Sequence, residues 1–324
     1  MTRVYCTYFD RGYASRGLAM IVSLRAVGES GPLYVVCFDE EAAAAVEAAS
    51  LSDVHVVRLA DLETEYPELA AVKEARSRVE YYFTSTPTVI SHALAAESDA
   101  SWVTYLDADL WFFSSPDRLF VEQDGGSVGI IEHGYRPQDA WRKKFGTYNV
   151  GWVSFRNDND GRTCLEWWRQ RCLEWCYDRP EDGKFADQGY LDGFSCVVGS
   201  VVVLRNPGAN LAPWNLATRT VRCSAGAVEV DGRPLVFFHF HGLQHRGRRW
   251  YFAHARYGAR TTTCVRDGLY HPYVQALLAQ QRSMGAEGAA GPRRRGSIMG
   301  TAKQTAARLL ALIRRDSLTA RQRA

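Results

Sequence analysis

The sequence lacks several features that would assign it to a particular class of protein. No apolar run approaches the ~18 residues that a membrane-spanning helix requires, and the N-terminal stretch MTRVYCTYFDRGY has no apolar core of a signal peptide. These absences predict a cytoplasmic protein. The eight cysteines are scattered and most lie in apolar runs, so they are predicted to be reduced thiols in the core.

Positive charge is scarce outside the C-terminal end. Residues 282–324 carry ten Lys and Arg against two Asp and Glu, whereas residues 1–281 carry 29 basic and 34 acidic residues. This mildly acidic body argues against nucleic acid as the main ligand, because binding a phosphate backbone requires a broad cationic surface. Residues 302–315 form an apolar stripe flanked by Arg, which favours a helix in peripheral contact with the inner face of a membrane. A helix docked on the body and a disordered tail stay open as alternatives.

Apolar and helix-like stretches alternate through the first half of the chain, which is typical of an α/β sheet with crossover helices. Strands are expected at 3–9, 33–38, 53–59, 101–106, 127–131 and 151–155, and helices at 13–27, 40–50, 61–75 and 79–97. Beyond residue 156 we expect a helix at 164–177, whose Trp and Cys residues are interpreted as core packing, and strands at 201–205 and 234–240.

Two carboxylates interrupt the apolar stretch TYLDADLWFF at residues 104–113. Unpaired carboxylates are costly in apolar surroundings and persist where they are paired, hydrogen-bonded or bound to a cation. After a strand at 101–106, Asp107 and Asp109 stand at the sheet edge where ligands gather, and near-extended chain points both side chains the same way. Such oxygen ligands suit Mg²⁺ or Mn²⁺ shared with a substrate phosphate. The alternative is that one Asp caps a turn and the other is solvated.

A second cluster, FFHFHG at residues 237–242, offers further ligands. Alternation along a strand puts His239 and His241 on one face. After Gly242, the chain enters a loop with His245 and Arg246 that could meet a diphosphate. Mixed Asp and His ligation favours Mn²⁺ over Mg²⁺. The alternative is that each His is a hydrogen-bonded core residue.

Four motifs occur in an order and spacing that resemble a known family: LDAD (106–109), NVG (149–151), DQGYL (187–191) and HFHG (239–242). They look like those of the GT-A glycosyltransferases, especially glycosyltransferase family 8, which includes glycogenin and bacterial lipopolysaccharide galactosyl- and glucosyltransferases. The opening TYFDRGYASRGLAMIVSL (7–24) is similar to that family's first strand and helix. The resemblance covers about residues 3–250.

The resemblance implies a mixed, mostly parallel Rossmann-like sheet flanked by helices. One transferase domain would span 1–281, with a nucleotide-binding half to about residue 125 and an acceptor half beyond it, followed by a basic linker and helix over 282–324. The implied activity is metal-dependent transfer of a sugar, with retention of configuration, from a nucleotide diphosphate to a glycan, a lipid-linked acceptor or another hydroxyl. The leaving phosphate would take the proton of the acceptor.

The resemblance also implies a role for each residue that matches a motif. The metal, Mn²⁺ or Mg²⁺, would be bound by Asp107, Asp109 and His239. The nucleoside pocket of a UDP-sugar donor would be lined by Thr7, Phe9, Asp10 and Tyr13, with Tyr13 stacking on uracil. The diphosphate would be contacted by Gly242 and His245, and the donor would also be contacted by Ala108. The donor sugar would face Asn149, Asp187 and Gln188, with Gln188 on the side where the anomeric carbon reacts.

Two departures from the family pattern affect the donor site. Position 245 is His where the family commonly has Lys, so Arg246 or His245 would neutralise the diphosphate. Residues 80–97 contain no Lys or Arg where relatives often use one, which leaves Lys73, Arg76 and Arg78 as substitutes.

Other interpretations remain beside the leading one. An inverting enzyme would need a general base, for which Asp187 and Glu132 are the candidates. A sugar-nucleotide pyrophosphorylase shares the architecture but predicts a Gly-rich G-x-G-x-R loop, which residues 1–30 lack. A non-catalytic carbohydrate-binding or scaffold protein is the third. Trp214 and Asn215 form either part of an acceptor platform or a structural loop.

Overall fold

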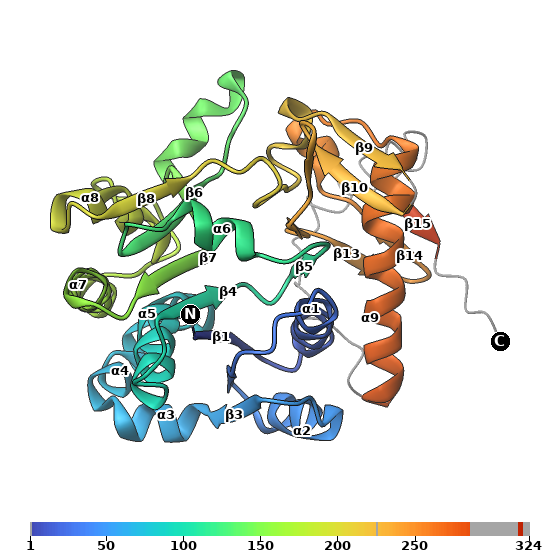
Figure 1. The fold of residues 1–324 in the computed structure, drawn as a ribbon. Coiled ribbons are helices and arrows are strands. Elements are labelled where there is room, and N and C mark those ends of the chain that lie inside the picture. Colours follow the sequence, from blue (N-terminus) through green and yellow to red (C-terminus); the bar gives the residue numbers. More distant parts are fainter. Residues whose placement is uncertain (1, 225, 286–316, 320–324) are drawn as a thin grey trace, which may run out of the picture.

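The computed structural model describes residues 2–224, 226–285 and 317–319. Its centre is a seven-stranded sheet with the order β3-β2-β1-β4-β7-β6-β8 (Figure 1). The strands are β1 (Arg3–Phe9), β2 (Leu33–Cys37), β3 (Val54–Arg58), β4 (Trp102–Leu106), β6 (Val128–Glu132), β7 (Tyr148–Arg156) and β8 (Val201–Leu204). Within this sheet only β7 runs antiparallel to its neighbours. The predicted mixed, mostly parallel sheet is therefore confirmed.

Helices cover both faces of the sheet (Figure 1). On one face lie α3 (Leu59–Glu65), α4 (Pro67–Ala71), α5 (Arg78–Ala96) and α7 (Asn159–Glu174), and on the other α1 (Ala14–Ala26), α2 (Glu40–Ala49) and α6 (Asp117–Glu122). Neighbouring residues of β1 face opposite cores, as expected of a strand buried on both sides: Val4 packs on the α5 side and Tyr5 on the α1 side. The helix predicted at 61–75 is broken instead, because Pro67 begins a new helix.

The Trp and Cys residues of α7 pack in the core, as predicted. Cys164, Trp168 and Cys172 are fully buried. Trp168 also donates through Nε1 to the Asp187 carbonyl at 2.9 Å, so α7 supports the DQGYL segment from behind.

A small second sheet beside the main one differs from the prediction. β4 ends at Leu106, as predicted, and a turn then leads into the short strand β5 (Leu110–Phe112), which was not predicted. β5 pairs antiparallel with β12 (Phe237–His239). The strand expected at 234–240 is thus divided between β12 and β11 (Arg233–Pro234).

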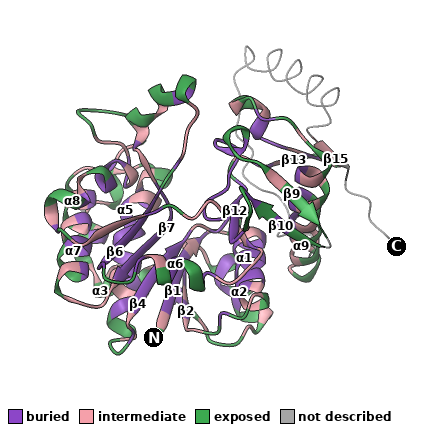
Figure 2. Cartoon of the chain, turned by 45° about the horizontal axis from the view of Figure 1, so that its top comes forward, coloured by how far each residue is buried: buried purple, intermediate pink, exposed green. Residues whose placement is uncertain are grey.

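The C-terminal third adds elements that the sequence pattern did not predict (Figure 2). They include a hairpin sheet of β9 (Val221–Ser224), β10 (Ala227–Val230) and β11, and a second one of β13 (Gln244–Arg246), β14 (Arg249–Tyr251) and β15 (Ser317–Thr319). A π-helix, η6 (Cys264–Tyr270), leads into α9 (His271–Ser283), which packs against α1. The remaining short helices are η1 (Lys73–Ala75), η2 (Pro137–Phe145), η3 (Gln188–Gly193), α8 (Phe194–Val197), η4 (Leu216–Thr218) and η5 (His254–Tyr257).

One cysteine pair corrects the prediction that all thiols are reduced. Cys223 on β9 and Cys264 at the start of η6 form a disulfide with a Cα–Cα distance of 5.5 Å. Their separation of 41 positions follows no local motif, so tertiary structure alone brings them together. The other six cysteines are free.

Two expectations concern the C-terminal tail and the membrane. The amphipathic stripe at 302–315 lies outside the described residues. None of the helices in the described ranges has both the length and the hydrophobicity needed to cross a bilayer.

Candidate active site

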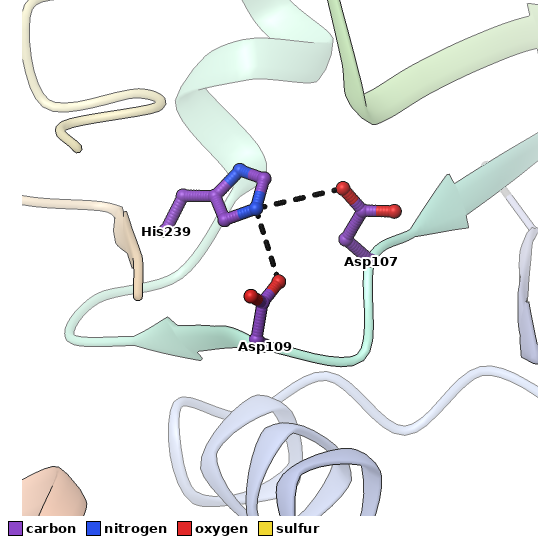
Figure 3. A group of neighbouring side chains, drawn as sticks. All are labelled: Asp107, Asp109 and His239. Atoms are coloured by element: carbon purple, nitrogen blue, oxygen red, sulfur yellow. Dashed lines mark ion pairs between the residues drawn. The ribbon is translucent and has the colours of Figure 1, made fainter. Parts of the chain in front are cut away.

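The carboxylates of the LDAD stretch lie in the tight turn between β4 and β5. The Leu110 N–H donates to the Asp107 carbonyl at 3.2 Å, and the Asp107 N–H donates to the Gly151 carbonyl at 3.1 Å. The Tyr105 hydroxyl donates to Asp107 Oδ1 at 3.0 Å. The sequence predicted near-extended chain at these residues. The turn shows that this prediction was wrong. The turn nevertheless directs the carboxylates of Asp107 and Asp109 toward a common side (Figure 3).

His239 reaches these acids from the distant strand β12. It pairs with Leu110 in the β5–β12 ladder, and the Phe240 N–H donates to the Asp109 carbonyl at 2.9 Å. His239 Nε2 lies 3.0 Å from Asp109 Oδ1 and 3.5 Å from Asp107 Oδ2 (Figure 3). One ligand atom from each of the three residues lies within 4.8 Å of the other two. Ligand bonds of about 2 Å would let all three bind one divalent ion.

The three groups strongly perturb one another. Burial raises the pKa of Asp107 despite the opposing charge of His239. Burial acts in the same direction on Asp109, but the charge and the hydrogen bond of His239 outweigh it and lower the pKa of Asp109 to about 2. The pKa of His239 is raised, because the charge of Asp109 outweighs the effect of burial. A divalent cation would need the neutral imidazole, since it takes the place of the Nε2 proton.

A relay of side-chain amides fixes the orientation of His239. The Phe145 carbonyl can only accept, so Gln188 donates to it through Nε2 at 2.6 Å and turns Oε1 toward Asn149 Nδ2 at 3.3 Å. Asn149 Oδ1 then accepts from the Gly151 N–H at 3.2 Å and lies 3.2 Å from His239 Nδ1. Because this oxygen can only accept, Nδ1 carries a proton. Nε2 is consequently the nitrogen left for a cation: its proton faces Asp109 in this structure, and a divalent ion would replace that proton, as in many metal sites.

The strand direction of β7 explains why Asn149 is available to this relay. β7 is antiparallel to β4, so its first residues lie where β4 ends. Asn149, the second residue of β7, therefore stands beside the carboxylate turn, although it begins a strand rather than following one. Gly151, two residues further along β7, lies where only glycine fits. A Cβ there would lie 2.7 Å from Asn149 Oδ1 and 2.8 Å from His239 Nδ1.

The carboxylate of Asp187 is buried and is held by a hydrogen bond from a neighbouring helix. Its Oδ2 accepts from Thr86 on α5 at 2.7 Å, and Thr86 is in turn 3.2 Å from the Tyr8 hydroxyl. Burial raises the pKa of Asp187 to about 7, and the hydrogen bond from Thr86 opposes the rise. Glu132, the other candidate base, is exposed at the end of β6.

The predicted nucleoside residues gather at the end of β1. Tyr13 is 41% exposed, and the Arg16 guanidinium lies 4.8 Å from its ring centre. Thr7 is fully buried, and its Oγ1 has no partner among the described residues. The side chain of Phe9 packs against Gly17 in the core, so its backbone is the part that a ligand could contact. The methyl group of Ala108 is likewise buried.

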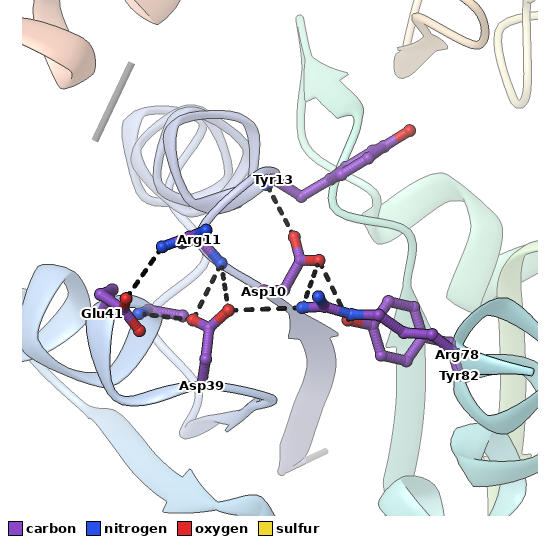
Figure 4. Close-up of polar contacts among 8 residues, drawn as sticks. Asp10, Arg11, Tyr13, Asp39, Glu41, Arg78 and Tyr82 are labelled. Carbon is purple, nitrogen blue, oxygen red and sulfur yellow. Dashed lines mark hydrogen bonds and ion pairs between the residues drawn. The ribbon is translucent and has the colours of Figure 1, made fainter. Parts of the chain in front are cut away.

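Asp10 is held in a polar cluster at this end of the sheet (Figure 4). Its Oδ2 accepts from Arg78 at 2.9 Å and from Tyr82 at 3.0 Å, and its Oδ1 accepts from the Tyr13 N–H at 3.2 Å. Arg78 is the first residue of α5, which begins there because Ser77 and Glu80 form a capping box.

The three suggested substitutes for a sugar-binding cation therefore have other contacts. Arg78 lies at the nucleoside end. Arg76 donates to the Tyr177 hydroxyl at 2.5 Å and to the Leu173 carbonyl at 3.1 Å, and Lys73 pairs with Glu63 at 2.7 Å.

Comparison with known proteins assigns the chain to a family. No family model matches it. The uncharacterised protein YfnF of Bacillus subtilis (strain 168) is 35% identical over 252 residues, which cover 75% of this chain and 82% of YfnF. YfnD of the same strain is 30% identical over 242 residues, 74% of this chain and 77% of YfnD. The chain belongs to the family of YfnF and YfnD.

A solved structure places this YfnF-family chain in a fold class. The galactosyltransferase LgtC, solved in complex with donor and acceptor sugar analogues, superimposes with a TM-score of 0.55 and 18% identity. The match covers 87% of this chain and 99% of LgtC. The fold is that of the GT-A glycosyltransferases, as the resemblance predicted.

The loop after β12 closes over α1 in this YfnF-family chain. Gly242 begins it at φ 69°, in the left-handed region that favours glycine. Arg16 donates to the Leu243 carbonyl at 3.0 Å, which ties the loop to α1. His245 is exposed and stacks on Trp250 at 4.3 Å between ring centres, so one of its faces is already covered.

The Trp214–Asn215 pair has two different roles. Asn215 is structural: its amide nitrogen donates to the carbonyls of His133 and Asn210, and its Oδ1 accepts from the Ala212 N–H. Trp214, in contrast, forms part of the wall of the site. Its ring centre lies 5.0 Å from that of His239.

Proposed function

We propose that this protein is a glycosyltransferase that transfers a hexose from a UDP-sugar, with Mn²⁺ or Mg²⁺ bound by Asp107, Asp109 and His239. The observation that carries the proposal is the convergence of these three side chains from two distant strands, with the relay through Asn149 orienting the imidazole. A bound divalent cation would act as a Lewis acid on the leaving diphosphate.

The residues of the chain supply binding and positioning. Tyr13 would stack on the base, and Gly242 and His245 would lie along the diphosphate. Gln188 and Asn149 present the site with amides whose orientation is fixed by the Phe145 carbonyl and the Gly151 N–H. Such preorganised dipoles stabilise developing charge without having to reorient during the reaction.

Retention of configuration is part of the proposal. An inverting reaction needs a carboxylate poised beside the acceptor hydroxyl. Asp187 has a pKa of about 7, but it is buried and its Oδ2 is engaged by Thr86, and Glu132 is exposed at the end of β6, so neither carboxylate is placed to take a proton from an acceptor hydroxyl. In a retaining reaction the leaving phosphate takes the acceptor proton, which requires no such residue.

The proposal is tested by measuring UDP release from UDP-glucose and UDP-galactose with and without Mn²⁺. We expect metal-dependent release by the unaltered chain and its loss in Asp109→Ala and His239→Ala. Asp99→Ala, which removes an exposed carboxylate elsewhere, is the matched control and should behave as the unaltered chain. A rise in Tm with Mn²⁺ and UDP that is absent in Asp109→Ala would report binding apart from turnover. No metal-dependent release from any UDP-sugar would refute the proposal in favour of a scaffold, and UTP formation from pyrophosphate would favour a pyrophosphorylase.

The proposal also includes a chemical class of acceptor and a cellular location for the protein. A glycan or lipid-linked hydroxyl is the expected acceptor, and the tail at 302–315 would bring the chain to the inner face of the membrane. Sedimentation of the full chain with anionic vesicles, compared with a chain ending at residue 289, tests the second point. Equal sedimentation of the two would remove it.

A further inference from the structure

A basic loop, residues 136–145, leaves β6 and returns to β7 at the edge of the site. Arg136 pairs with Asp139 at 2.6 Å, and Arg142 lies 3.8 Å from the same carboxylate. Lys143 and Lys144 are exposed and have no acidic partner in the part of the chain that the structure describes. The body of the protein is mildly acidic, so this gathering of positive charge is a local feature rather than a property of the whole surface.

The basic loop is continuous with the candidate active site. The Phe145 carbonyl at its end accepts from Gln188, and the next residue, Gly146, packs so closely on Gln188 that a Cβ there would lie 3.1 Å from Gln188 Cγ. Across the site, Arg142 lies over the Tyr257 ring at 4.8 Å. The exposed Arg256 directly precedes Tyr257 in the chain. Positive charge from two separate segments of the chain therefore gathers at this edge of the site.

Aromatic side chains pack against one another beside His239. The His133 and Tyr135 rings are stacked at 4.7 Å, and His133 meets Trp214 edge to face at 5.2 Å. Trp214 is 3% exposed, and its Nε1 has no hydrogen-bond partner among the described atoms. A buried donor without a partner is costly, and a sugar hydroxyl would satisfy it. On the basic loop itself, Trp141 is 55% exposed, with Lys144 Nζ at 5.3 Å from its ring centre.

The order of strands separates this region from the donor. The nucleoside cluster follows β1, the carboxylate turn follows β4, Asn149 begins β7, and the basic loop joins β6 to β7. At about 4.8 Å between neighbouring strands, β6 lies roughly 14 Å from β1. A UDP-sugar laid along this edge has its diphosphate near the carboxylate turn and its sugar near Asn149. The basic loop is then left facing the acceptor.

We propose that the acceptor is a saccharide that carries an anionic group, a carboxylate or a phosphate, which Lys143 and Lys144 bind while its sugar ring lies against Trp214 and Tyr135. This inference rests on the proposed function and specifies its second substrate. In the transfer, the acceptor hydroxyl oxygen forms a bond to the anomeric carbon as the bond from that carbon to the diphosphate breaks. The electron pair leaves with the diphosphate, which takes the hydroxyl proton, so the products are UDP and an anionic glycoside.

The experiment compares saccharides that differ only in charge. Binding of 4-nitrophenyl β-glucoside, β-glucuronide and β-glucoside 6-phosphate is measured by calorimetry on the full chain saturated with UDP and Mn²⁺. We expect the two anionic probes to bind about three- to tenfold more tightly than the neutral one, which is the range for two exposed ion pairs. The preference should shrink as NaCl rises from 50 to 500 mM, because salt screens exposed charges.

Variants then locate the preference. Lys143→Gln/Lys144→Gln should abolish it and leave affinity for the neutral glucoside unchanged, whereas Arg118→Gln, which neutralises an exposed cation on α6, should keep it. Equal binding of charged and neutral probes, or a preference that survives in the double variant, would overturn the inference. Metal-dependent UDP release without acceptor is measured on the same samples. If release is present and the charge preference is absent, the acceptor inference fails while the proposed transferase function stands.

Discussion

Asn149→Ala should weaken metal binding although Asn149 is not a proposed ligand. The substitution removes the oxygen that accepts from His239 Nδ1 and from the Gly151 N–H, both at 3.2 Å. The imidazole then loses the partner that fixes its tautomer and its rotation. Removing such a supporting group typically costs 10–100-fold in metal affinity, which is about 1.4–2.8 kcal/mol. We expect a loss in this range for Mn²⁺.

Asn149→Asp provides a sharper comparison. A carboxylate still accepts from His239 and Gly151, but it cannot donate to Gln188 Oε1, whose orientation is fixed by the Phe145 carbonyl. The Asp variant should therefore bind Mn²⁺ within about threefold of the unaltered chain, as carboxylate–histidine pairs do in other metal sites. Its turnover should still fall, because Gln188, which we propose to face the donor sugar, loses its partner.

The assay is titration with Mn²⁺ at saturating UDP, with free Mn²⁺ followed by electron paramagnetic resonance. Asn159→Ala, which makes the same chemical change at an exposed position on α7, is the control. Unchanged Mn²⁺ affinity in Asn149→Ala would refute the orienting role. Equal weakening by Ala and Asp would also refute it, because any change at this position would then disturb the site regardless of what accepts the imidazole proton.

Three further predictions concern the pH dependence of Tm, the contribution of the disulfide to the free energy of unfolding, and the Tm shift with Mn²⁺. Asp187→Asn should raise Tm relative to the unaltered chain at pH 8 and much less at pH 5. The pKa of Asp187 is about 7 when folded against about 3.9 unfolded, so the unaltered chain loses stability as pH rises from about 4 to about 7, and the loss is complete above 7. A Tm difference that does not grow with pH would contradict this. Cys223→Ser/Cys264→Ser should lower the free energy of unfolding by up to about 4 kcal/mol, since the disulfide closes a loop of 41 positions, and a denaturant titration that detects no loss with unchanged m would count against it. Gly151→Ala should fold but lose the Tm shift with Mn²⁺, because its Cβ would displace His239; a normal shift would show that the imidazole tolerates the methyl group.

The parts of the fold that the sequence predicted share a physical cause. β1 to β4 and the helices between them bury apolar residues with a clear period, so most of their bounds agree within one or two residues. The carboxylate turn was located because charge in an apolar run is costly, although its conformation was predicted wrongly. Asp107, Asp109 and His239 were assigned to one site from strand ends and from resemblance, and the structure brings them together.

Other features depend on contacts that no local pattern records. The Cys223–Cys264 disulfide joins positions far apart in the sequence, in a region of short strands with weak periodicity. The contacts of Asn215 with backbone carbonyls exist only once two loops meet. Gln188 was predicted to face the donor sugar, but its contact with the Phe145 carbonyl could not be foreseen, because it depends on the path of the basic loop.

The ladder between β5 and β12 has a consequence for biosynthesis. A nascent chain released from the ribosome as far as residue 236 already possesses both carboxylates of the turn, yet it has no imidazole to join them. The full set of three candidate ligands therefore forms late in translation, when the partner strand emerges and adopts its register beside Leu110. Until then a half-made polypeptide has only two of the three groups that could bind a metal ion in the complete site.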